Sequence, residues 1–180
     1  KVFGSNPNIV TAIDNVNMDV VSGEFVVIAG KSGSGKTTLL NLMAGLDKPT
    51  SGQVFLGGTD LNSLNNRELI EMRRHKIGFI YQSFGLLPLL STYENIELPL
   101  HIAGIPRCER RKRSLEMLEM LGLSARMKHR PFELSGGEQQ RVSIARAFVS
   151  NPAIIFADEP TAELDIISAE EIGALLKGIV

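Results

Sequence analysis

The chain has 180 residues, of which 43% are hydrophobic, 22% charged and 6% aromatic, and Cys108 is its single cysteine. This composition is that of an ordinary folded domain and excludes a disordered chain, a collagen-like repeat and a disulfide scaffold. Nineteen basic and twenty acidic residues give a net charge of -1, which argues against a dedicated nucleic-acid binder, and no apolar run approaches a bilayer-spanning length.

The first predicted elements are a strand and a helix joined by a glycine-rich turn. Residues 25–29 are apolar and rich in β-branched side chains, as is typical of a buried strand. Residues 37–46 show the apolar periodicity of a helix. The turn between them, residues 30–37, reads GKSGSGKT and matches G-x-x-x-x-G-K-[ST] in the strand–turn–helix setting that this pattern requires.

This turn, the phosphate loop, is predicted to bind a nucleotide. Small residues let successive backbone N–H groups converge on a phosphate, and the following helix directs the positive end of its dipole toward it. Lys36 would contact the outer phosphates, and the Thr37 hydroxyl would help to hold Mg²⁺. The alternative is a glycine-rich turn that matches by chance. The candidate nucleotide-binding residues are Gly30, Ser32, Gly33, Ser34, Gly35, Lys36, Thr37 and Thr38.

Short strands alternate with helices along the rest of the chain. We expect strands at residues 53–56, 76–81 and 153–157, and helices at 67–74, 135–150 and 169–177. Residues 93–121 are helical in pattern, with interruptions at Gly104 and Pro106. The alternation predicts an α/β fold with a mainly parallel sheet, and the strand-free stretch at about 92–150 predicts a helical lobe beside it.

The last predicted strand carries two acidic residues to its carboxyl end. Asp158 and Glu159 follow the apolar run, and open α/β sheets place ligands at such ends. Asp158 would hold Mg²⁺, and Glu159 would act as general base on an attacking water. The alternative is a strand followed by a solvated acidic turn.

The most specific pattern is LSGGEQQ at residues 134–140, the signature segment, where a helix is expected to begin. Ser135 and Glu138 form a predicted capping box, and Gly136 and Gly137 expose backbone N–H groups suited to a phosphate. Taken alone, the segment could be a plain helix cap. Together with the phosphate loop and the acidic strand it resembles the LSGGQ-like signature of the ATP-binding cassette (ABC) ATPases, over essentially the whole chain.

The resemblance implies roles for further residues. Gln82 is similar to the Q-loop glutamine, which senses Mg²⁺ and the membrane partner, so it joins Lys36 and Glu159 as a catalytic candidate and Thr37 and Asp158 as a metal ligand. Residues 161–165 are similar to the D-loop, and Asp165 is similar to its aspartate near the dimer seam, which makes it a further nucleotide-binding candidate. Phe3 lies where the family places an aromatic that stacks on adenine, although Phe3 could equally be a core residue.

The resemblance also implies the fold and the partners. Residues 1–180 would form a single ABC ATPase domain: a phosphate-loop NTPase core with a mainly parallel sheet, a small antiparallel β portion and an inserted helical lobe at about 92–150. Two copies would form a head-to-tail homodimer, with each ATP held by the phosphate loop of one subunit and residues 135–138 of the other. An integral membrane transporter subunit would be the second partner, at the cytoplasmic face of the cell membrane, with no role for nucleic acid.

Three segments, residues 46–52, 81–88 and 94–100, look most like the lipoprotein-releasing and macrolide-export group. The expected function is therefore ATP hydrolysis that powers export or extraction of a lipoprotein, peptide or drug-like substrate. The alternatives are a non-transport ABC ATPase and an ATP-dependent regulator of a cell-division membrane complex. The apolar residues 84–90 would receive the partner's coupling helix or pack within the helical lobe.

Two features fit the family less directly. The family normally has a switch histidine after the D-loop helix, but His75, His101 and His129 all precede Asp158. The opening sheet strand that the family places ahead of the adenine-stacking aromatic is also mostly absent. We therefore expect the sequence to be incomplete at both ends and to hydrolyse ATP weakly by itself. The histidines lack metal-ligand spacing, and the basic run at 107–113 is expected to be the solvated start of an amphipathic helix, with phospholipid headgroup contact as the alternative.

Overall fold

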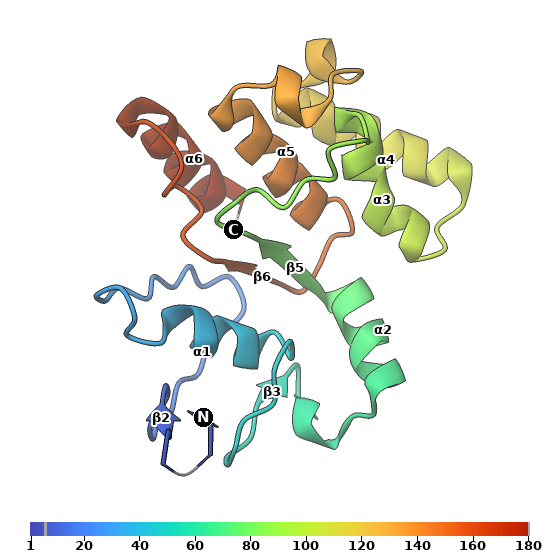
Figure 1. Cartoon of the computed structure of the whole chain (residues 1–180). Helices are drawn as coiled ribbons and strands as arrows, with labels where there is room; N and C mark the ends of the chain where they lie inside the picture. The colour runs from blue at the N-terminus through green and yellow to red at the C-terminus, as the bar shows by residue number, and fades with distance from the viewer. Residues whose placement is uncertain (6, 180) are drawn as a thin grey trace. The chain divides into compact units, whose positions relative to one another are not determined.

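The computed structural model describes residues 1–5 and 7–179 (Figure 1). These residues form two compact units, an N-terminal unit, Lys1–Glu71, and a C-terminal unit, Met72–Ile179. No helix in the described ranges is both long enough and apolar enough to cross a membrane.

The N-terminal unit contains two short antiparallel ladders. β1 (Val2–Phe3) pairs with β2 (Val10–Thr11), and β3 (Phe55–Leu56) pairs with β4 (Thr59–Asp60). A 3₁₀ turn, η1 (Leu61–Ser63), follows the second ladder. These ladders are the small antiparallel portion that the sequence predicts, and β3 covers the second half of the strand predicted at residues 53–56.

The helix of this unit, α1 (Lys36–Met43), is shorter than the predicted 37–46. Gly45 has a φ of 63°, and its N–H donates to the carbonyl oxygen of Leu42 at 3.1 Å, while the Leu46 N–H donates to that of Asn41 at 2.8 Å. This pair of bonds is a Schellman motif, which requires a left-handed residue just past the helix. The left-handed Gly45 therefore ends the helix early, although the apolar periodicity of the sequence continues to residue 46.

The prediction of a strand at residues 25–29 is wrong. The segment has no assigned strand, and the described part of the chain offers it no ladder partner. Phe25, Val26 and Val27 are 46%, 42% and 74% exposed. The residue types favour a buried strand. A strand forms, however, only where a neighbouring strand satisfies its backbone hydrogen-bonding groups, and the sequence of the segment itself does not show whether such a neighbour exists.

The C-terminal unit combines one parallel strand pair with helices. Its regular elements are β5 (Ile77–Ile80), α3 (Thr92–Ile102), α4 (Arg107–Met120), α5 (Gly136–Phe148), β6 (Ile154–Ala157) and α6 (Ile166–Ile179), with 3₁₀ turns η2 (Ser124–Arg126) and η3 (Pro131–Glu133). The preceding helix, α2 (Asn66–Lys76), begins in the N-terminal unit. β5 and β6 are parallel, with Ile77 opposite Ile154 and Ile80 opposite Ala157. The predicted parallel pairing and the helix break at Gly104 and Pro106 are both confirmed.

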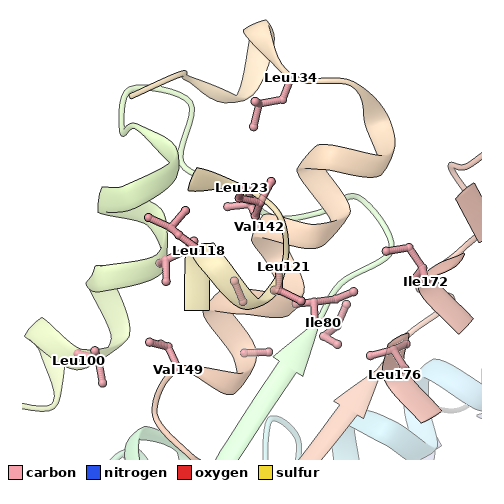
Figure 2. Packing of buried hydrophobic residues seen from close by; sticks show 14 residues of the cluster. Ile80, Leu100, Leu118, Leu121, Leu123, Leu134, Val142, Val149, Ile172 and Leu176 are labelled. Atoms are coloured by element: carbon pink, nitrogen blue, oxygen red, sulfur yellow. The ribbon is translucent and has the colours of Figure 1, made fainter. Parts of the chain in front are cut away.

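The core of the C-terminal unit lies where its helices meet β5 (Figure 2). α5 packs on α3, α6 and β5, and α3 also packs on α4. Each of these elements contributes a side chain that is at most 1% exposed: Ile80, Ile96, Leu118, Val142 and Ile172. Because protein interiors are close-packed, this cluster fixes the two ends that carry predicted site residues, the start of α5 and the end of β6.

Candidate functional site

The phosphate loop lies in the N-terminal unit and leads into α1. Gly33 and Gly35 have φ angles of 77° and 92°, in the left-handed region that favours glycine. A Cβ on Gly35 would lie 2.5 Å from the carbonyl oxygen of Ala12, so no larger residue fits there without displacement. The loop is thus a cradle of exposed backbone at a helix N-terminus, as a phosphate site requires.

Two side chains of the phosphate loop supply charge and a hydroxyl group. The Lys36 Nζ donates to the carbonyl oxygens of Gly30 and Lys31 at 3.1 and 3.2 Å, which folds the ammonium back over the loop. Thr37 is exposed in the first turn of α1. A narrow glycine cradle with an ammonium group over it and a hydroxyl beside it fits the triphosphate of a nucleotide.

Phe3 is not a core residue. It lies in β1 and is 43% exposed. The Lys1 Nζ lies 4.7 Å from the centroid of its ring, a cation–π contact. The core alternative is therefore excluded, and the aromatic face is placed at the surface of the N-terminal unit.

The C-terminal unit gathers the other predicted residues, beginning with Gln82 and Asp158. Gln82 lies two residues after β5, and Asp158 directly follows β6. The Asp158 N–H donates to the carbonyl oxygen of Ile80 at 3.0 Å, so the parallel pairing extends past the strand end. Both residues therefore lie at the carboxyl edge of the strand pair, the expected place for a ligand.

Glu159 has an unusual backbone conformation. Its φ is 45°, although it is neither glycine nor asparagine, and its side chain is exposed. Left-handed backbone at such a residue costs about 1–2 kcal/mol, so its surroundings must hold it there. One such contact is the turn in which the Glu159 carbonyl oxygen accepts the N–H of Ala162 at 3.1 Å. The arrangement fixes the backbone at Glu159 and leaves its side chain exposed to water.

The signature segment begins α5 with the predicted capping box. The Ser135 Oγ accepts the Glu138 N–H at 3.2 Å, and the Glu138 Oε2 accepts the Ser135 N–H at 2.9 Å. The Arg126 Nε lies 2.8 Å from the Glu138 Oε1. Arg126 and, after it, the Ser135 N–H lower the pKa of the Glu138 carboxyl. Glu138 is thus held in place as part of the helix cap.

The two signature glycines also have a packing role that the sequence did not indicate. A Cβ on Gly137 would lie 3.3 Å from the Ser168 Oγ, and one on Gly136 would lie 3.6 Å from the Leu164 Cδ2. The start of α5 is therefore packed closely against the D-loop and the first turn of α6. Gly137 is the tighter of the two positions.

Asp165 caps α6. Its Oδ1 accepts the Ser168 N–H at 3.0 Å, and its Oδ2 accepts the Ser168 hydroxyl at 2.8 Å. The backbone N–H of Ser168 and then its hydroxyl lower the pKa of the Asp165 carboxyl. A structural role is therefore present at this residue beside the predicted one at the dimer seam.

The metal ligands suggested by the sequence are all oxygen donors. Thr37, Gln82 and Asp158 supply a hydroxyl, an amide and a carboxylate, which are the hard ligands that Mg²⁺ accepts, usually with waters and substrate phosphates completing its shell. Within the described ranges, no three His, Cys, Asp or Glu side chains form a metal-binding group.

Sequence reasoning missed two polar residues of α5 that contact the site segments. The Gln140 Nε2 donates to the carbonyl oxygen of Pro160 at 2.6 Å. The Arg146 Nη1 and Nη2 donate to the carbonyl oxygens of Gly85 and Phe84 at 2.6 and 3.1 Å, in the loop after Gln82. A signal was available for Gln140, because it is polar but shares the apolar helix face of residues 144 and 147.

Comparison with known proteins supports the resemblance. Residues 13–162 match the family model described as ABC transporter. The chain is 50% identical to the ABC transporter ATP-binding protein MJ0796 of Methanocaldococcus jannaschii, with 98% of this chain and 77% of that protein covered. It is 46% identical to the macrolide export ATP-binding/permease protein MacB of Brucella melitensis, covering 99% of this chain and 28% of MacB.

Solved structures agree with the sequence matches. The dimeric structure of the MJ0796 cassette superposes with a TM-score of 0.90 at 48% identity, covering 99% of this chain and 79% of that one. A post-hydrolysis dimer of MJ0796 bound to ADP and Pi gives a TM-score of 0.89 at the same identity and coverage. The predicted α/β phosphate-loop fold is therefore confirmed, and the chain belongs to the ABC transporter family as an ATP-binding cassette that hydrolyses ATP to drive transport.

Proposed function

We propose that this cassette powers export or extraction of a lipoprotein, a peptide or a drug-like compound through a separate membrane subunit. Its similarity to MacB, which is named as a macrolide export protein, supports this choice of cargo class. The cassette would act at the cytoplasmic face of the cell membrane, bound to the membrane subunit.

We further propose that the whole chain works as one nucleotide-binding domain with a helical subdomain at about 92–150. The family model supports this, because residues 13–162 extend across both compact units. The helices α3, α4 and α5 occupy the region of the proposed subdomain.

The active form is proposed to be a head-to-tail homodimer. Two solved structures of a relative are described as dimeric, one of them with ADP and Pi. The phosphate loop offers one helix N-terminus to the triphosphate, and the exposed Ser135 at the start of α5 offers a second from the partner subunit. Two helix N-termini on opposite sides of the triphosphate would compensate its negative charge better than one N-terminus alone.

Within this dimer, the residues of the chain take distinct roles. Phe3 stacks on the adenine ring, and the Lys36 ammonium exchanges its loop carbonyls for phosphate oxygens. Thr37, Gln82 and Asp158 hold Mg²⁺, which when bound neutralises charge on the phosphates.

The proposed hydrolysis step rests on the carboxylate at 159. A water attacks the γ-phosphorus, the bond between this phosphorus and the β–γ bridging oxygen breaks, and ADP leaves with that oxygen. Glu159 accepts the proton of the water at its carboxylate, and its exposure and fixed backbone support this role.

The exposed, left-handed Glu159 next to Asp158 is the observation that carries the proposal, and substitution of Glu159 tests it. Glu159→Gln keeps the shape of the side chain but removes its capacity to accept a proton. We expect kcat for ATP to fall by about 10²–10⁴-fold with nucleotide binding retained. Steady-state hydrolysis and equilibrium binding of a fluorescent ATP analogue measure the two quantities. Turnover equal to that of the unsubstituted protein would show that another group is the base.

A further inference from the structure

Gln140 in α5 contacts the segment that carries Glu159. Its side chain is 0% exposed. The Nε2 atom donates to the carbonyl oxygen of Pro160 at 2.6 Å, a short bond that spans 20 residues of sequence. Pro160 directly follows Glu159, so the bond anchors the backbone one residue beyond the proposed base.

The orientation of the Gln140 amide follows from its partner. A proline carbonyl can only accept a hydrogen bond, so the NH₂ group must face Pro160 and the Oε1 atom must face away. Among the described residues, no donor reaches this buried Oε1. A buried acceptor left without a donor is unfavourable. An apolar side chain of similar shape would avoid that penalty but would lose the bond to Pro160, so the net gain in stability from a glutamine here is small.

The backbone around Glu159 shows what the bond can do. Glu159 has a φ of 45°, a conformation that its surroundings must impose. Before it, the Asp158 N–H is bonded to Ile80 in β5, and after it, the Pro160 carbonyl is bonded to Gln140 in α5. The strained residue is thus held between a strand and a helix that both belong to the packed core.

We propose that Gln140 is a positioning residue that holds Glu159 in its left-handed conformation and thereby aims its carboxylate at the attacking water. Without the bond, the backbone at Glu159 is free to relax toward an ordinary conformation, which moves the carboxylate. The inference rests on the proposed role of Glu159 as general base. It also links the two ATP sites of the proposed dimer, because the helix that carries Gln140 begins with the signature segment that faces the other site.

Gln140→Met tests the proposal, because methionine fills a similar volume without a donor or an acceptor. We expect kcat for ATP hydrolysis to fall by about 10- to 100-fold, since a displacement of about 1 Å can cost 10²-fold. KM for ATP should stay within about threefold, because Gln140 is not among the proposed nucleotide-binding residues. The melting temperature should change little, because loss of the bond to Pro160 is offset by removal of the buried, unpaired Oε1 atom. Gln140→Glu, which turns a carboxylate oxygen toward the Pro160 carbonyl, should lower kcat further.

Ser143→Ala is the matched control, because Ser143 is also 0% exposed and lies in the same helix. Its Oγ has no hydrogen-bond partner in the described part of the chain, so kcat should be unchanged. In a second comparison, Gln140→Met is combined with Glu159→Gln. If Gln140 acts through Glu159, it should have little further effect once the base is removed.

The possible outcomes separate this inference from the proposed function. If the unsubstituted protein does not hydrolyse ATP, or if Glu159→Gln has no effect, the proposed function fails and the inference with it. If Glu159→Gln abolishes turnover but Gln140→Met retains full kcat, only the inference fails. A marked drop in melting temperature for Gln140→Met, or equal losses in the presence and absence of Glu159, would assign Gln140 a purely structural role.

Discussion

At the scale of single residues, some side chains that are predicted to contact nucleotide also stabilise the fold. Glu138 and Asp165 both lie in segments predicted to contact nucleotide, yet each carboxylate accepts hydrogen bonds that cap a helix. A substitution at either residue therefore changes both stability and any contact with ATP. Measurements of stability without nucleotide isolate the first effect.

The Glu138 cap has a predictable pH dependence. Arg126 and the Ser135 N–H lower the pKa of this carboxyl in the folded protein. A lowered folded pKa gives stabilisation that is complete above the ordinary value of about 4.3 and is lost as the pH falls through the folded pKa. Glu138→Gln should therefore cost about 0.2–1 kcal/mol at pH 7, because the Arg126 pair is partly exposed, and much less at acid pH.

Urea unfolding at pH 7 and pH 3 without nucleotide measures this difference. Glu119→Gln on α4 is the control, since Glu119 is exposed and lies outside the signature segment. A cost for Glu138→Gln that is the same at both pH values would show that the charge at Glu138 does not contribute.

At the residue scale, the sequence indicates which residues are candidates for the chemistry, but it does not indicate their backbone conformation. The phosphate loop and the signature segment have fixed spacings, because the backbone must present consecutive N–H groups to an anion. Glu159 is left-handed, and Gln140 bonds to Pro160, 20 residues away. Both features depend on contacts between separate segments, so they cannot be predicted from the local sequence.

At the scale of elements, glycine positions decide where the turns close. The Gly35 that precedes α1 combines a φ of 92° with a neighbouring carbonyl 2.5 Å from where a Cβ would lie, whereas Gly23 has a φ of 78° with open space around it. Gly23→Ala should therefore cost about 1 kcal/mol from backbone strain alone. Gly35→Ala should cost more and should also weaken ATP binding, because the phosphate loop must shift.

Chemical denaturation and ATP-analogue binding of the two variants check this prediction. Gly23→Ala serves as the matched control, because it has the same type of backbone strain without the close contact. Equal destabilisation by the two substitutions, or unchanged nucleotide binding in Gly35→Ala, would contradict the account of the cradle.

Elements were predicted well where one helix or loop carries its own signal. The capping box of α5 and the break between α3 and α4 lie in contiguous residues, so local propensity defines them. The prediction for residues 25–29 was wrong because strand formation requires a second segment to pair with, and the local sequence carries no signal for it. The packing of α5 against the D-loop likewise could not be predicted from the sequence.

At the scale of the whole molecule, the central claim is that ATP is clamped between two copies of the chain. The phosphate loop of one copy and the start of α5 of the other would supply the two helix N-termini. Ser135→Arg places a bulky side chain at the second of these ends and should prevent closure, while the phosphate loop remains able to bind nucleotide. This variant is the control for the measurement of assembly.

Sedimentation velocity of the Glu159→Gln protein, with and without ATP and Mg²⁺, tests the claim most directly. Because the substitution blocks hydrolysis, a closed dimer should accumulate. The account predicts a monomer without nucleotide, a dimer with ATP and Mg²⁺, and a monomer again when Ser135→Arg is added. A Glu159→Gln protein that binds ATP yet stays monomeric at every nucleotide concentration would contradict the shared site.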